Sequence, residues 1–204
     1  MANNLRRTYH IIGIVVSQIV NVPFIAGAAI TLLLFTVQPD VPQRLIGWGV
    51  SLIFLAIVPA LSLLFYIPRR NEPWASTEKR QRVMSFVFMA VSYPIGFVMT
   101  KLVQAPAIFE AIMLTYVIVV LGLILVNTFF KASGHAAGVA GPVSAMIYLY
   151  GLIAAPLIAL IPLTMWARVR AKGHTLSQTI VGALLSAAIT VTVLFLYGFR
   201  PGQF

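Results

Sequence analysis

The chain has 204 residues, of which 60% are hydrophobic and only 9% are charged. Soluble globular domains carry about a quarter charged residues, so this composition excludes a water-soluble domain. Apolar runs recur along the whole chain. They are longer than the strands of a membrane β-barrel, and they lack the alternation of apolar and polar residues that such strands show. The sequence therefore predicts an all-α fold: a polytopic transmembrane helical bundle of about six or seven spans, forming a single domain over residues 1–204.

Residue counts also exclude several kinds of site. The chain has no cysteine, which removes disulfides and thiolate chemistry. Its four acids are too scattered to hold Mg²⁺ on a diphosphate or to drive a carboxylate-based ion pump; they are Asp40, Glu72, Glu78 and Glu110. The net charge of +10 favours an anionic partner instead, either a phosphate group or an anionic lipid. We expect no cofactor, no metal and no nucleic-acid partner, and the oligomeric state stays open.

The first four spans follow one another with polar segments between them. We expect them at about residues 10–37, 45–67, 83–102 and 107–130. Pro23 is expected to kink the first span, because a proline inside a helix removes one backbone hydrogen bond. Gln38 to Gln43 should form a short turn. Residues 68–82 make up the long polar segment before the third span.

The later spans are less clearly separated. Residues 136–166 stay apolar for 31 residues, and one helix of that length would measure about 46 Å, beyond a hydrocarbon core of about 30 Å. Because glycines and prolines interrupt the run, we predict two short helices, at roughly 136–150 and 153–166. One long tilted span is the alternative. Residues 168–173 are then a basic loop, and a last span covers about 175–197.

The charges are distributed unequally between the two faces that these spans define. With seven crossings, eleven lysines and arginines lie on one face and three on the other. The positive-inside rule places the richer face in the cytoplasm. We therefore expect an integral protein of a prokaryotic plasma membrane.

Three polar clusters lie on that richer face, at residues 78–82, 131–135 and 168–178. Cationic side chains and the N–H groups of helix N-termini bind a phosphoryl group without a metal. One histidine can attack phosphorus while a second protonates the departing oxygen. His135 and His174 are the candidates for these two roles.

The clusters resemble the motifs of the type 2 phosphatidic acid phosphatase superfamily, which consists of integral membrane lipid phosphatases. One family motif, Pro-Ser-Gly-His, is similar to Ser133-Gly134-His135. Another has Ser-Arg, five residues, His, three residues and Asp, and it is similar to Arg168 followed by His174. The resemblance covers about residues 79–182, the core region of the predicted site.

The chain also departs from the family pattern. The first family motif has a lysine and an arginine six residues apart, whereas Lys79 and Arg82 are three apart. Alanine replaces the proline before Ser133 and the serine before Arg168. The aspartate that should follow the second histidine is Gln178, which can orient the imidazole but supplies no charge.

The resemblance implies a metal-independent lipid phosphatase or diphosphatase with a phosphohistidine intermediate. In that scheme His174 attacks phosphorus, Gln178 orients His174, and His135 is the general acid and base. The phosphate would be held by a set of five residues: Lys79, Arg82, Ser133, Gly134 and Arg168. Since the chain has no sizeable soluble domain, we expect a phosphorylated lipid substrate, and an isoprenoid phosphate or diphosphate fits.

Two alternatives remain open at this stage. Gln178 favours a weak or inactive relative that binds or carries a phosphorylated lipid. A small-solute transporter with broken helices is the third hypothesis. Small residues are interpreted as packing positions and not as site residues, because their spacing allows helices to approach closely; these are Gly138, Gly141 and Gly182.

Overall fold

The computed structural model describes residues 12–13, 15–16, 20, 22–36, 41–67 and 74–204, without the side chains of residues 66, 74–79 and 81. All regular elements in these ranges are helices. Five helical stretches are long and apolar enough to cross a membrane: Val41–Phe65, Arg82–Leu102, Ala107–Asn127, Gly134–Arg170 and Leu176–Leu196. Large apolar side chains face outward along them, with Leu152 91% and Phe195 69% exposed. Such a surface suits lipid and not water, so the chain is an integral membrane protein.

The predicted first span is described only in part. Its regular portion is α2 (Val22–Thr36), an apolar helix of 15 residues. Pro23 is the second residue of α2, and the kink expected there would involve residues 17–19 and 21, which lie outside the described residues. Gln38, which opens the predicted polar turn, also lies outside the described residues.

The second span begins earlier than predicted and is irregular. It consists of α3 (Val41–Leu52), a π-helical segment η1 (Ile53–Ile57), α4 (Val58–Ala60) and a 3₁₀ segment η2 (Leu61–Tyr66). Pro42 and Gln43, expected in a turn, lie instead in the first turn of α3, where a proline costs no hydrogen bond. Pro59 cannot donate to the helix, and the hydrogen-bonding pattern changes on both sides of it.

The next two helices form a hairpin. The first, α5 (Trp74–Leu102), begins inside the polar segment, because no helix breaker stands between Trp74 and Arg82. The second, α6 (Ala107–Asn127), ends three residues before the predicted limit of Phe130. An ion pair of 2.8 Å joins Lys101 to Glu110 beside the turn between the two helices.

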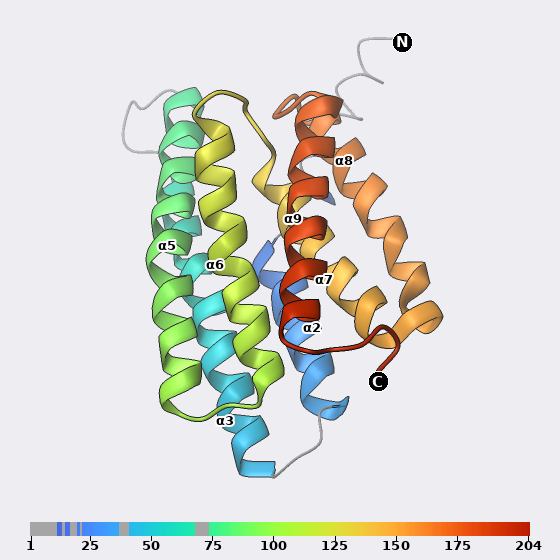
Figure 1. The fold of residues 1–204 in the computed structure, drawn as a ribbon. Helices are drawn as coiled ribbons and strands as arrows, with labels where there is room; N and C mark the ends of the chain where they lie inside the picture. Colours follow the sequence, from blue (N-terminus) through green and yellow to red (C-terminus); the bar gives the residue numbers. More distant parts are fainter. Residues whose placement is uncertain (1–11, 14, 17–19, 21, 37–40, 68–73) are drawn as a thin grey trace.

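The long apolar run after Ser133 folds back on itself. It forms α7 (Gly134–Tyr150), a 3₁₀ segment η3 (Gly151–Ala159) and α8 (Leu160–Arg170). Gly151 has φ of +62°, a conformation that favours glycine, and it ends α7. Figure 1 shows α7 and α8 running in opposite directions, which favours two short helices over one long tilted span.

The predicted basic loop at residues 168–173 is partly wrong. Helix α8 continues through Arg168 and Arg170, so the loop begins only at Ala171. The last helix, α9 (Leu176–Leu196), matches the predicted span to within one residue at each end.

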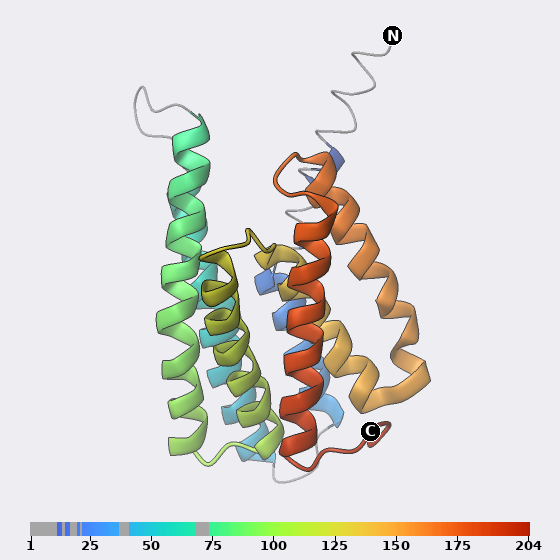
Figure 2. The same ribbon diagram turned by 45° about the horizontal axis from the view of Figure 1, so that its top comes forward.

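The helices place the polar clusters at one end of the bundle. The start of α7, the end of α8 and the start of α9 lie toward the same end, and the α5–α6 turn and the C-terminus lie at the other (Figure 1). We call these the site end and the far end. The connection from α6 descends before α7 begins (Figure 1), and Figure 2 shows this connection below the upper ends of α5 and α9.

Candidate functional site

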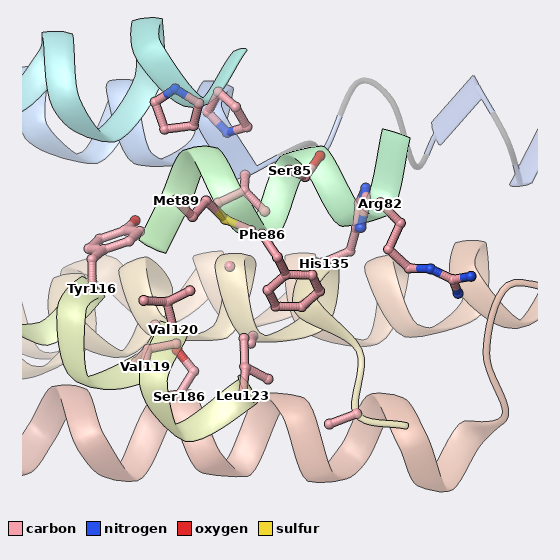
Figure 3. Close-up of a pocket in the computed structure, with 18 of the residues that line it drawn as sticks. Arg82, Ser85, Phe86, Met89, Tyr116, Val119, Val120, Leu123, His135 and Ser186 are labelled. Carbon is pink, nitrogen blue, oxygen red and sulfur yellow. The ribbon is translucent and has the colours of Figure 1, made fainter. Parts of the chain in front are cut away.

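A cavity of about 160 Å³ enters the helix bundle from the site end. Five cationic or histidine side chains line it: Arg82, Lys131, His135, Arg168 and His174. They come from α5, the α6–α7 connection, α7, α8 and the α8–α9 loop. No carboxylate is among the described residues that line the cavity. Figure 3 shows Arg82 and His135 at one end of it, and apolar side chains from α5 and α6 farther in.

The start of α7 is held in place by α9. Ser133 is the N-cap of α7, and its hydroxyl accepts from the amide of Ala136 at 3.3 Å. The amide of Ser133 donates to the backbone carbonyl of Gln178 at 2.9 Å. This approach requires a glycine, because a Cβ at Gly182 would lie 2.4 Å from the carbonyl oxygen of Ser133. The prediction that Gly182 is a packing position is therefore confirmed, and its packing fixes the start of α7.

The same geometry exposes the N-terminal turn of α7 to the cavity. Gly134 and His135 both line it. Amides in the first turn of a helix have no partner within the helix and point toward its N-terminal end. That end of α7 therefore offers N–H donors and the positive end of a helix dipole to an anion.

Arg168 is positioned by the way α8 ends. The amide of Gly173 donates to the carbonyl of Arg168 at 3.1 Å, and the amide of Lys172 donates to that of Val169 at 3.0 Å. This pair of bonds is a Schellman motif, with Lys172 in the left-handed position at φ +56°. A Cβ at Gly173 would lie 2.7 Å from Nη2 of Arg168, so the guanidinium packs directly on the loop before His174.

The tautomer of His174 follows from a capping box at the start of α9. The backbone amide of Thr175 donates to Oε1 of Gln178 at 3.1 Å, and the amide of Gln178 donates to the Thr175 hydroxyl at 3.3 Å. Since an amide only donates, the atom of Gln178 that faces it is the oxygen. The same Oε1 lies 3.2 Å from Nδ1 of His174, so Nδ1 carries the proton and donates to it. The lone pair of His174 is then on Nε2.

Burial and neighbouring cations keep His174 neutral. Burial, first of all, and the charges of Arg168 and Lys131 together lower its pKa from 6.5 to about 4, against a smaller opposing effect from the bond to Gln178. Burial also lowers the pKa of Lys131, together with the charges of Arg82 and Arg168. These cations repel one another, so an anion bound among them would be stabilised.

Some residues of the predicted site do not reach the cavity. The side chain of Ser133 is fully buried as the helix cap and does not line the cavity, which makes it a support for α7. Gln178 does not line the cavity either, but its side chain contacts His174, which does. The side chain of Lys79, another predicted phosphate ligand, lies outside the described parts of the chain.

The predicted phosphate-binding set does not include Lys131, although this residue belongs to the polar cluster at residues 131–135. Its Nζ donates to the carbonyl of Gly173 at 3.1 Å, which bridges the α6–α7 connection to the loop before His174. Its position directly before the Ser133 segment was the available signal, but the family pattern assigns no role to that position. Asn127, Ser85 and Ser62 also line the cavity, and the two serine hydroxyls are bonded to each other at 3.0 Å.

The arrangement combines a neutral imidazole, a second histidine, three cations and a helix N-terminus around one cavity. Among the described residues, no group of three histidine or acidic side chains is placed to hold a metal ion. Comparisons with protein-family models, with curated proteins and with solved structures each give no match.

Proposed function

We propose that this chain is a membrane lipid phosphatase or diphosphatase that works without a metal, through a phosphohistidine at His174. The observation that carries the proposal is that His135, His174 and Arg168 line one cavity, although they come from three different elements. Arg82, Lys131 and Arg168 would hold the phosphate oxygens, together with the amides at the start of α7. Lys79 is also proposed as a phosphate ligand, from the resemblance alone.

The reaction proceeds in two balanced steps. Nε2 of His174 attacks phosphorus and forms a P–N bond while the P–O bond to the leaving group breaks. His135 gives its proton to the departing alkoxide or phosphate oxygen. His135 then takes a proton from water, whose oxygen attacks phosphorus, and the P–N bond breaks to release phosphate and free His174.

The hydrogen-bonding pattern supports this assignment of roles. Since Nδ1 of His174 donates to Gln178, the lone pair on Nε2 is available to attack. A pKa of about 4 keeps His174 unprotonated at neutral pH.

The membrane placement belongs to the same proposal. With seven crossings, the positive-inside rule would put the site end in the cytoplasm of a prokaryote. The substrate would enter from the bilayer, because the cavity reaches into the apolar part of the bundle. An isoprenoid phosphate or diphosphate suits a site with a cationic mouth and an apolar interior.

A second candidate is a protein that binds or carries a phosphorylated lipid without hydrolysing it. Gln178 favours this candidate, because an amide gives no charge to stabilise an imidazolium. The cavity would bind the same lipids in either case, so turnover separates the two.

The test is phosphate release from isoprenoid phosphates and diphosphates by the purified protein in detergent, with a chelator present. We expect release by the wild type and none by His174→Ala. Arg168→Ala should lose most activity, whereas Arg170→Ala is its matched control, since Arg170 is on the same helix but does not line the cavity. Full activity of His174→Ala would refute the mechanism, and binding without release would favour the carrier.

A further inference from the structure

The cavity has an apolar inner part that extends well beyond the phosphate-binding end. Arg82 and Tyr93 both line it from α5, and eleven residues of α-helix cover about 16 Å. The lining between these two ends is mainly apolar, and α5 and α6 contribute five of its side chains: Phe86, Met89, Val119, Val120 and Leu123. Figure 3 shows these side chains between Arg82 and Tyr116. A single hydrocarbon chain fits such a wall better than a second polar group.

Two tyrosines stand at the inner end. The rings of Tyr93 and Tyr116 meet edge to face, with centroids 5.2 Å apart. Their exposed fractions are 2% and 8%. Neither hydroxyl has a hydrogen-bond partner among the described residues. Because both hydroxyl oxygens are buried, the rings are the parts of these residues that line the cavity.

Tyr116 also separates the cavity from a second one. A small inner cavity of about 10 Å³ lies on the other side and shares Thr115, Tyr116, Gly141 and Pro142 with the first. Of these four, Tyr116 has the largest side chain. Gly141 has no side chain to add to the wall, and a Cβ there would lie 2.6 Å from Oγ of Ser186. Removing the ring of Tyr116 would join the two cavities.

We propose that Tyr116, backed by Tyr93, is the stop that sets the length of the substrate's hydrocarbon chain. The inference rests on the proposed function, because it assumes that the phosphate binds at the cationic end. A chain shorter than the cavity leaves apolar wall unfilled, and each buried methylene adds roughly fourfold in affinity until the chain meets the ring. A longer chain would have to bend or leave the cavity.

The experiment measures binding and hydrolysis of a series of alkyl phosphates of increasing length, with purified full-length protein in detergent. For the wild type we expect affinity to rise with length and then stop rising. Tyr116→Ala should move that limit to longer chains. Tyr116→Phe is the matched control, because it keeps the ring and removes only an unpaired hydroxyl, so its limit should equal that of the wild type.

Two further variants keep the test decisive if Tyr116→Ala does not fold. Tyr116→Leu shortens the side chain while it keeps the site apolar, and it should also shift the limit to longer chains. Val120→Phe adds bulk to the wall between the two ends and should shift the limit to shorter chains.

The outcomes separate this inference from the proposed function. A limit that does not move in any ring-removing variant, or that moves equally in Tyr116→Phe, overturns the inference, and hydrolysis by the wild type would still support a phosphatase. Binding with a movable limit but no phosphate release supports the inference and refutes the hydrolase. Release that is independent of chain length in the wild type also overturns the inference.

Discussion

The backbone amide of Ser133 donates to the backbone carbonyl of Gln178 at 2.9 Å, which joins the start of α7 to the first turn of α9. The bond holds the segment before His135 beside the residue that orients His174. The bond depends on Gly182, because any side chain at that position would collide with the backbone of Ser133. Gly182 is thus a positioning residue for both histidines, although it lines no part of the cavity.

Replacing Gly182 tests this relationship. In Gly182→Ala the new methyl would lie 2.4 Å from a backbone oxygen, which has no flexible side chain to move aside. We expect a loss of about 1–3 kcal/mol in stability, as for other overpacked sites, together with loss of phosphate release.

Gly122→Ala is the matched control. Gly122 also lies within a helix, but its Cβ would meet only side-chain atoms at 3.5 Å or more. Its thermal midpoint in detergent should stay the same or rise, and its activity should be unchanged. Equal behaviour of the two variants would contradict the positioning role of Gly182.

A carboxylate can be introduced at position 178 in a side chain of the same length as glutamine. Gln178→Glu keeps the capping box, because glutamate also accepts from the amide of Thr175. Its carboxylate should raise the pKa of His174 above about 4 and stabilise the imidazolium. Because each unit of pKa shift corresponds to about 1.4 kcal/mol of imidazolium stabilisation, we expect the rate to rise about tenfold.

The control for that variant is Gln178→Leu, which has a similar length but no acceptor. It should lower the rate, since Nδ1 of His174 loses its partner. If Gln178→Glu hydrolyses no lipid phosphate at all, the result supports the carrier hypothesis and contradicts the proposed hydrolase activity.

The stability of the ligand-free protein should depend on pH through His174. Its pKa is lowered from 6.5 to about 4 in the folded state, so the unfolded chain binds the proton more readily. Stability is therefore unaffected above pH 6.5, falls as the pH drops toward 4, and levels off below that. Thermal midpoints measured across this range should show a smaller fall in His174→Gln than in the wild type. An identical fall in both would mean that His174 is not buried as a neutral ring.

Gly173 tests the placement of the Arg168 guanidinium. In Gly173→Ala the new methyl would meet the mobile end of that side chain at 2.7 Å, so the fold can adapt at little cost. The guanidinium would nevertheless move from its position on the loop. We expect a nearly unchanged thermal midpoint and a KM raised several-fold, measured with an isoprenoid phosphate. An unchanged KM would show that Arg168 does not bind the substrate from this position.

The sequence predicted the helical segments better than their ends. Residues 176–196 match a predicted span closely, because a polar capping box precedes a continuous apolar run. The fold-back at Gly151 was one of two open interpretations, since glycines and prolines mark a break but not the direction that follows it. Arg168 was placed in a loop, because the Schellman motif that extends α8 depends on Lys172 adopting a left-handed conformation.

The same limit applies to the site. Local motifs named His135 and His174, but the contact of Lys131 with Gly173 joins residues 42 positions apart, and no local spacing predicts it. The resemblance to the lipid phosphatases implies that the Ser133 hydroxyl binds the phosphate. Its burial as a helix cap becomes visible only when the packing against Gly182 is known. The inner end of the cavity likewise arises from residues on separate helices.

The most direct test of the account is to find the phosphate on the protein. The purified wild type would be mixed with a labelled isoprenoid phosphate, quenched in alkali to preserve phosphohistidine, digested, and analysed by mass spectrometry. The account predicts label on Nε2 of His174, and none in His174→Ala. Phosphate release by the wild type with no label on the peptide that contains His174, or with label on His135 instead, would contradict it.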